Sequence, residues 1–130
     1  MNKLNIAVVG CRHFTDYEKL RGVMDDFIDI HKDKDICIVS GGARGADSLA
    51  EKYASEKGYE FKCFPADWDT HGKIAGFIRN KDIVDAADTI VAFWDGKSTG
   101  TKDTLEKARR AGVHDYICGI DGYVDRRWTT

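Results

Sequence analysis

Short apolar runs alternate with amphipathic segments along most of the chain, and this alternation most limits what it can fold into. The apolar runs predicted as strands are residues 3–10, 35–40, 59–65, 88–94 and 115–120. The segments between them, with apolar residues at helical spacing, are residues 16–32, 45–58, 72–87 and 100–112. Strands that are apolar along nearly their whole length are typical of a parallel sheet that is covered on both faces.

We therefore expect an α/β fold: a single doubly wound, Rossmann-like domain with a mainly parallel five-stranded sheet and helices on both faces. The 130 residues are enough for one domain with its own core. Residues 1–130 contain no repeat, linker or low-complexity segment, and residues 121–130 form a short polar tail to which no element is assigned.

Charge and hydropathy exclude some partners. The chain has 20 basic and 22 acidic residues, a formal net charge of −2, so the strongly basic footprint of a nucleic-acid-binding protein is missing, which argues against nucleic acid as a partner. No apolar run is long enough to cross a bilayer, and the first one fits a strand better than a signal peptide. We expect no membrane partner.

The cysteines and histidines indicate a reduced, metal-free protein. No two cysteines form a C-x-x-C pair, so we expect free thiols and a cytoplasmic location. No histidine pairs with a cysteine, histidine or carboxylate at metal-ligand spacing, so we expect no metal site, and the sequence indicates no cofactor. The cysteines are Cys11, Cys37, Cys63 and Cys118.

The loops after the first four predicted strands are the candidates for function. Ligands of doubly wound sheets bind beyond the carboxyl ends of the strands, near the point where the strand order reverses. The loops there read "GCRHF", "SGGARGAD", "PADWDTHGK" and "WDGKSTGT". We expect them to meet at one edge of the sheet.

The second of these loops has the composition of a phosphate site. Glycines let the main chain approach a ligand, the following helix offers unpaired N–H groups, and an arginine supplies a planar charged fork. The alternative is a tight turn with Asp47 or Ser48 capping the helix. The loop has neither a G-x-G-x-x-G nor a Walker pattern. Its predicted ligand-binding residues are Ser40, Gly41, Gly42, Arg44, Gly45 and Asp47.

The fourth loop is a second candidate phosphate or ribose site. Ser98, Gly100 and Thr101 would bring hydroxyl and N–H groups to the start of a helix, although Thr99 or Thr101 would also cap it. Asp95 fits either a contact to ribose hydroxyls or the end of the strand in an Asx-turn.

Two arginines and two tryptophans complete the candidates. In the first loop, Gly10 and Arg12 point to the same edge, unless Arg12 only pairs with Asp16 or Glu18. In the third helix, Arg79 reaches either the cleft or the solvent. A base can stack on an aromatic ring at a strand end, although core packing is the commoner role of such rings. The two rings are those of Trp68 and Trp94.

Taken together, the motifs "GCRHFTDY", "VSGGARGADSLAEKYA", "FPADWDTHGKIAGFIRN" and "VAFWDGKSTGTKDTLEKA" resemble the YspA-type branch of the SLOG superfamily, which is related to YpsA-like proteins. The resemblance extends to about residue 112. The superfamily is similar to the cytokinin-activating phosphoribohydrolases and to the Rossmann domain of DNA-processing protein A. This resemblance implies a Rossmann-like fold, a nucleotide-derived ligand and a setting in phage or bacterial conflict systems.

The resemblance also assigns roles. It implies a second phosphate-side motif at Gly100 and Thr101, and Arg79 near a sugar. The residues of the first phosphate-side motif that it implies are Gly41, Gly42, Arg44, Gly45 and Asp47. Thr104 stands where the phosphoribohydrolases have their glutamate, and threonine can neither stabilise a developing positive charge nor activate water well. Carboxylates that could replace the glutamate are Asp47, Glu51, Asp95 and Asp103.

Three functions therefore remain open. The first is binding or sensing of a phosphorylated nucleotide-derived small molecule, such as a nucleotide or an ADP-ribose-like compound. The second is hydrolysis of a nucleotide's N-glycosidic bond, and the third is binding of single-stranded DNA. By analogy with similar folds, we also expect a homo-oligomer.

Overall fold

Five parallel strands form the sheet of the computed structural model, which describes residues 2–123 and 125–127. They are β1 (Lys3–Gly10), β2 (Asp35–Ser40), β3 (Glu60–Cys63), β4 (Thr89–Trp94) and β5 (His114–Gly119). Their order is β3-β2-β1-β4-β5, which confirms the expected Rossmann-like fold. A short sixth strand, β6 (Arg126–Arg127), pairs antiparallel with β5. It comes from the tail to which the sequence assigned no element.

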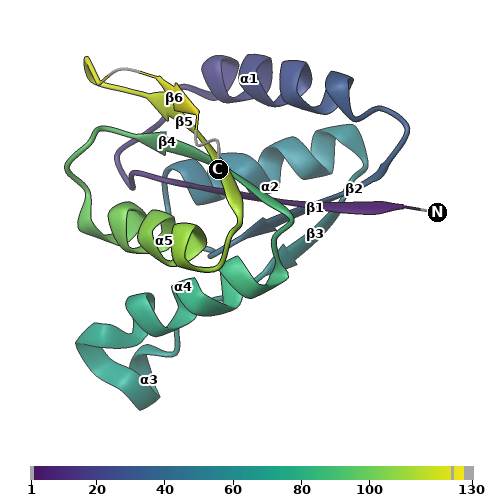
Figure 1. Cartoon of the computed structure of the whole chain (residues 1–130). Helices are drawn as coiled ribbons and strands as arrows, with labels where there is room; N and C mark the ends of the chain where they lie inside the picture. Colours follow the sequence, from purple (N-terminus) through teal and green to yellow (C-terminus); the bar gives the residue numbers. More distant parts are fainter. Residues whose placement is uncertain (1, 124, 128–130) are drawn as a thin grey trace.

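Helices cover both faces of the sheet (Figure 1). On one face lie α1 (Tyr17–Ile30) and α2 (Ala46–Lys57), and on the other lie α4 (Ala75–Ala86) and α5 (Thr99–Arg110). The chain runs outward from β1 to β3 and then returns to β4 beside β1, so the strand order reverses between β1 and β4. The carboxyl ends of these two strands are therefore where a ligand crevice is expected.

The core lies between the sheet and these helices. Residues 6–9 of β1 and 90–93 of β4 are buried, because both strands lie inside the sheet and both of their faces are covered. Helix α1 buries Leu20, Met24 and Ile28, four residues apart, which places them on one side of the helix. Ile30, the last residue of the same helix, is apolar but lies outside this buried side and is 74% exposed.

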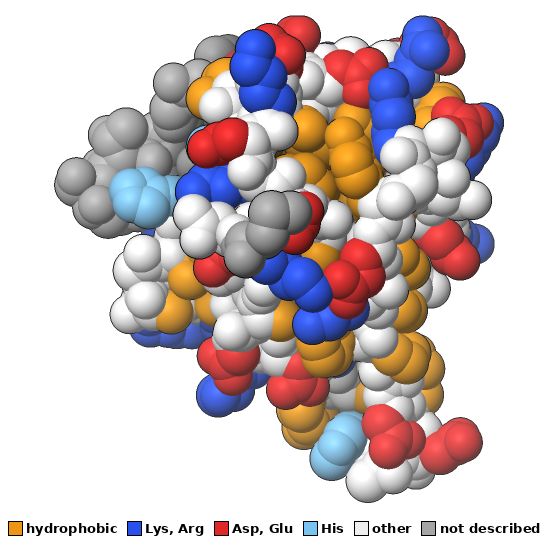
Figure 2. All heavy atoms as spheres, turned by 90° about the vertical axis from the view of Figure 1, so that its right-hand side faces the viewer, with side chains coloured by type: hydrophobic (Ala, Val, Ile, Leu, Met, Phe, Trp, Pro, Cys, Tyr) orange, Lys and Arg blue, Asp and Glu red, His pale blue; other side chains and the backbone are white. Residues whose placement is uncertain are grey.

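One apolar pattern points outward. The sequence groups Ile74, Phe77, Ile78 and Ile83 on one helix, but only Ile83 is buried, and the other three are 40–58% exposed. They lie along η1 (Gly72–Ile74) and α4, next to the short helix α3 (Trp68–His71) that the sequence did not predict. Figure 2 shows hydrophobic side chains running down this protruding part of the molecule.

None of the described helices has the length and apolar character needed to cross a membrane. The homo-oligomer stays a prediction.

A glycine joins the loops that follow β1 and β2. Gly45 has φ 77 and ψ −130, a conformation that is costly for other residues. A Cβ there would also overlap the carbonyl groups of Cys11 and Arg12. The next amide, that of Ala46, donates to the Cys11 carbonyl at 3.2 Å. The absence of a side chain at residue 45 thus lets the two loops touch.

Replacing Gly45 by alanine should destabilise the fold through this contact. Gly58 is the matched control, because it also has a positive φ, 73°, but a Cβ there meets nothing within 4 Å. We expect Gly58→Ala to lower the free energy of unfolding by about 1 kcal/mol, and Gly45→Ala by about 3 kcal/mol or more. Urea unfolding of both variants measures the difference. Equal losses would show that the loops do not need this close approach.

Candidate functional site

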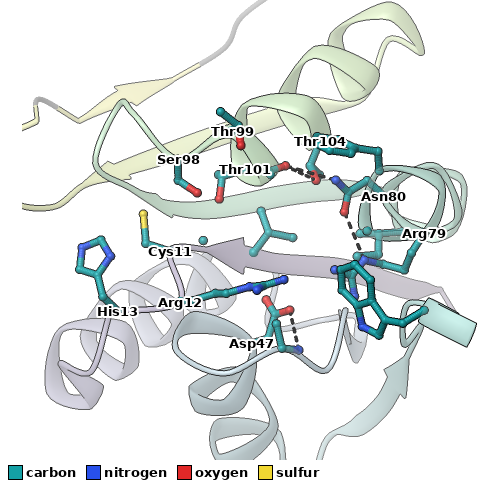
Figure 3. A pocket seen from close by; sticks show the side chains of 18 of the residues that line it. Cys11, Arg12, His13, Asp47, Arg79, Asn80, Ser98, Thr99, Thr101 and Thr104 are labelled. Carbon is teal, nitrogen blue, oxygen red and sulfur yellow. Dashed lines mark hydrogen bonds between the residues drawn. The ribbon is translucent and has the colours of Figure 1, made fainter. Parts of the chain in front are cut away.

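A cavity of about 450 Å³ opens at the carboxyl ends of β1 and β4 (Figure 3). Its walls come from the loops after β1, β2 and β4 and from α3, η1 and α4. The volume lies in the range of small-molecule sites. The two glycine-rich turns predicted from the sequence therefore meet at one cavity, as residues of both line it.

A second depression, of about 530 Å³, adjoins the first. Both are lined by Arg12, Ala43, Trp68 and Arg79, so these residues form the divide between them. The second depression also contacts the glycine-rich turn after β2. Predicted residues that line it and not the first cavity are Gly41, Gly42 and Arg44.

Asp47 occupies part of the predicted phosphate cradle. Its side chain accepts a hydrogen bond from the Ala43 amide at 3.1 Å and also interacts with the Gly41 amide and Ser40. These two amides are thus directed at the protein's own carboxylate, so the turn after β2 is a less open anion cradle than the sequence implies. The alternative role, a cap of α2 by Asp47 or Ser48, is not observed either. The N-cap residue is Gly45, and no described side chain forms a cap hydrogen bond at this helix.

The Asp47 carboxylate lies close to Arg79. Burial raises the pKa of Asp47, and the Ala43 amide and the Arg79 charge only partly oppose this. Burial likewise lowers the pKa of Arg79, while Asp47 opposes that shift. Arg79 donates to the carbonyls of Gly41 and, at 3.2 Å, Phe64. Its guanidinium thus fixes the loops after β2 and β3 and still borders both cavities.

Asn80 connects the two motifs and was missed by the sequence prediction. It is buried, and its Oδ1 accepts from Nε of Arg79 at 3.2 Å. Its Nδ2 donates to the Gly100 carbonyl at 3.2 Å and to Asp103 at 3.0 Å. An amide can do this because it both donates and accepts. The only signal in the sequence was a polar pair, Arg79 and Asn80, inside an otherwise apolar helix.

The start of α5 supplies the second motif. Ser98 is the N-cap, but no described side chain forms a cap hydrogen bond, so the predicted threonine cap is wrong. The first N–H groups of a helix have no acceptor within it. Residues 98–101 line the cavity with these groups and with hydroxyls. The hydroxyl of Thr104, also in α5, donates to the Gly100 carbonyl at 3.3 Å.

Arg12 brings a second guanidinium to the cavity. The side chain is exposed, and no hydrogen bond or ion pair joins it to another described residue. The alternative partners are engaged elsewhere, since Asp16 accepts from the Lys19 amide and Glu18 pairs with Arg21. In Figure 3 the Arg12 side chain points across the cavity toward Asp47.

The two tryptophans lie in different surroundings. Trp94 is buried, donates from Nε1 to the Ser98 carbonyl at 3.0 Å and packs edge-on against Tyr123. It does not line the cavity, so the stacking role predicted for it is wrong: its indole N–H finds its partner in the adjacent turn. Trp68 is 49% exposed and lines both depressions.

The candidate catalytic carboxylates, Asp47, Glu51, Asp95 and Asp103, lie in different surroundings. Only Asp47 lines the cavity, whereas Asp103 is held by Asn80 and Lys107. Asp95 accepts from the amides of Lys97 and Ser98, at 2.8 and 2.9 Å, as in an Asx-turn.

Among the other predicted residues, Ser40 is buried and donates to the Val8 carbonyl, while Gly10 lines the cavity. Lining residues that the sequence did not single out include Lys73, Phe77 and Asn80. The fold also brings ligand atoms of Cys11, His13 and Asp95 within 4.8 Å of one another, which the spacing along the sequence did not indicate. Cys63 is an exposed thiol.

The strand order and the crevice between β1 and β4 define a Rossmann-like α/β protein. The profile of the YspA, cpYpsA-related SLOG family matches residues 4–71, more than half of the chain. The Gene 61 protein of Mycobacterium phage D29 is 34% identical over 115 residues, which cover 83% of this chain and 90% of that protein. The chain belongs to the YspA, cpYpsA-related SLOG family.

Solved structures share the fold. DNA processing protein A of Streptococcus pneumoniae superposes with a TM-score of 0.75 at 19% identity, over 92% of this chain and 52% of that one. The chain thus spans about half the length of that protein. The Helicobacter pylori protein of the same name gives 0.71 at 19% identity, over 95% and 69%. TM1055, a structural-genomics target, gives 0.61 at 19%, over 84% and 70%.

The raised pKa of Asp47 predicts how stability depends on pH. The ordinary value is 3.8, and burial raises it in the folded protein, so the folded state holds this proton to higher pH than the unfolded chain does. Wild-type stability should therefore fall relative to Asp47→Asn as pH rises above 3.8, and the difference should level off once Asp47 ionises in the folded state as well.

Urea unfolding across this pH range measures the difference, with the exposed Asp82→Asn as the background variant. Asparagine can still accept from the Ala43 amide, so the turn should persist. A wild-type protein that gains stability over Asp47→Asn with rising pH would contradict the buried position of this carboxyl.

Proposed function

We propose that the protein binds or senses a phosphorylated nucleotide-derived small molecule, such as a nucleotide or an ADP-ribose-like compound, in the cavity between the loops after β1 and β4. One observation carries the proposal. The Arg12 guanidinium, without a partner among the described residues, lines the same cavity as the uncapped first turn of α5. A free cation opposite a helix N-terminus is the arrangement that favours a phosphate.

The other residues fit the remaining parts of such a ligand. Ser98 and Thr101 line the cavity beside the α5 amides and would donate to phosphate oxygens. Asp47 would accept from a ribose hydroxyl, since it lines the cavity beside Arg79. The half-exposed Trp68 ring would stack on a base.

Binding is better supported than N-glycosidic hydrolysis. Cleavage needs a carboxylate beside the sugar, and the residue at the phosphoribohydrolase glutamate position is Thr104, whose hydroxyl is bonded to a carbonyl. Asp95 and Asp103 are both engaged by neighbouring groups. Asp47 alone remains at the cavity, so a hydrolase would depend on it. Chromatography for free base after incubation with nucleoside monophosphates tests this second candidate.

Removing the Arg12 charge should weaken binding of the nucleotide. We expect Arg12→Gln to raise the Kd for ADP-ribose or a nucleoside monophosphate about 10- to 100-fold, because a charge-assisted hydrogen bond contributes about 1.5–3 kcal/mol. Titration calorimetry of each compound with the wild type and the variant gives the ratio.

Arg110→Gln is the matched control, because Arg110 is an exposed arginine at the far end of α5. Its Kd should equal that of the wild type. The proposal fails if no phosphorylated compound binds, or if both arginine variants weaken binding equally.

Single-stranded DNA is a second candidate ligand. The depression beside the cavity is lined by Arg12, Arg44 and Arg79 together with the exposed ring of Trp68. Positive charge along a groove with an aromatic stacking platform suits single strands. DNA processing protein A from Helicobacter pylori, which shares the fold, has been described with a single-stranded DNA binding mode. The net charge of −2 argues against an extended contact.

Fluorescence anisotropy with a labelled oligothymidylate distinguishes the two ligands. If the nucleotide proposal holds, the oligonucleotide should bind weakly, and free nucleotide should compete. If DNA is the ligand, affinity should fall steeply with salt. Trp68→Ala should then cost about 1–3 kcal/mol, and Trp68→Phe should retain most of the binding.

A further inference from the structure

Three side chains that commonly bind metals meet at one end of the cavity. Cys11 and His13 come from the loop after β1, and Asp95 comes from the loop after β4. One ligand atom from each lies within 4.8 Å of the other two. In Figure 3, Cys11 and His13 lie at the end of the pocket opposite Arg79 and Asn80. The cluster is thus separate from the two-arginine divide.

Two of these ligands are held by the main chain. Cys11 is buried, its amide donates to the Phe93 carbonyl at 3.0 Å, and its carbonyl accepts from Phe14 and Ala46. Asp95 is fixed by the amides of Lys97 and Ser98, both of which bond to Oδ1. The Asp95 carboxylate also interacts with the Cys11 thiol, so these two candidate ligands already contact each other.

The third ligand has an orienting partner. Nε2 of His13 lies 2.6 Å from Oδ2 of Asp121. Histidines that bind metals usually donate their other ring N–H to a carboxylate, which fixes the tautomer and orients the ring. In this arrangement Nδ1 of His13 is the nitrogen left for a metal. Asp121 is also the non-glycine residue with positive φ, 53°, among the described residues.

The spacing suits a small cation after a modest adjustment. Zinc bonds to sulfur, nitrogen and oxygen of about 2.0–2.3 Å place tetrahedral ligands about 3.5 Å apart. The 4.8 Å limit therefore calls for a contraction of about 1 Å. The His13 side chain, which is 57% exposed, can make this movement.

We propose that Cys11, His13 and Asp95 form a divalent-metal site with a zinc-like preference and one coordination position open to the cavity. A thiolate, an imidazole and a carboxylate are ligands that zinc accepts. The two negative charges balance the charge of the cation. An open fourth position would face the cavity that Cys11 and His13 line, where water or a ligand oxygen can bind.

The same trio can be compared with a nucleophilic cysteine and its base. Cys11 is buried, and the charged side chain that lies next to its thiol is the Asp95 carboxylate. A reactive cysteine needs the opposite, a thiolate stabilised by positive charge. A bound divalent cation supplies that charge and deprotonates the thiol. The geometry therefore favours a metal ligand over a nucleophile.

Cobalt titration of the full chain tests the site, because Co²⁺ replaces Zn²⁺ and reports thiolate ligation as an ultraviolet charge-transfer band. The wild type should bind one equivalent with this band, and Zn²⁺ should displace it. Cys11→Ser should abolish the band, and His13→Ala should weaken Co²⁺ binding at least about tenfold. Asp121→Asn, which asparagine tolerates at positive φ, should weaken it about 10- to 100-fold.

Cys63→Ser is the control, since Cys63 is an exposed thiol outside the cluster, and its spectrum should match the wild type. Circular dichroism shows whether each variant is folded, and His13 and Asp121, both exposed, are the replacements least able to disturb the core. A missing band, a band that survives Cys11→Ser or a band lost in Cys63→Ser overturns the proposal. Rapid, His13-dependent alkylation of Cys11 in metal-free protein would also overturn it, in favour of a nucleophile.

This inference does not rest on the proposed nucleotide ligand. Loss of nucleotide binding in Arg12→Gln with an unchanged cobalt spectrum would separate the two sites. Nucleotide binding without a cobalt band would reject the metal site alone.

Discussion

The main chain of Cys11 holds together the turns on which the site depends. Its amide donates to β4 through the Phe93 carbonyl, and its carbonyl accepts from Ala46 at the start of α2. One residue thus ties the loop after β1 to the neighbouring strand and to the glycine-rich turn. Gly45 permits this contact because it has no side chain. The cavity, the position of Arg12 and the cluster around His13 all follow from this arrangement.

A second set of contacts crosses the cavity. Asp47 lies against Arg79, Arg79 is bonded to Asn80, and Asn80 is bonded to the Gly100 carbonyl at the start of α5. The two glycine-rich motifs are therefore connected through buried polar groups, and such groups are costly to leave unpaired. These contacts hold the far wall of the cavity, while Arg12 and the first turn of α5 remain open to an anion.

This division is the physical basis for proposing a binding pocket in preference to a hydrolytic site. Two carboxylates near the cavity are engaged by the protein's own turns. Asp47 accepts a hydrogen bond from an amide of the turn after β2, and Asp95 accepts from an amide of the turn after β4. The Asp95 carboxylate is a poor general base, because its main-chain hydrogen bonds stabilise the charged form and lower its pKa. The features left for a ligand are guanidinium groups, hydroxyls and helix amides, and these bind phosphate.

The sequence by itself determined the sheet and the edge at which the site lies. Nearly continuous apolar runs require a parallel sheet covered on both faces, and the carboxyl ends of parallel strands share one edge. It also indicated Arg12, Arg79 and the turn at residues 98–101. Only the tertiary structure decided that Trp94 is buried and that Asp47 accepts a hydrogen bond from an amide of the turn after β2. It also decided that Cys11, His13 and Asp95 lie close together. Local spacing cannot give these outcomes, because each polar group's partner comes from a different loop and is set by how the strands and helices pack.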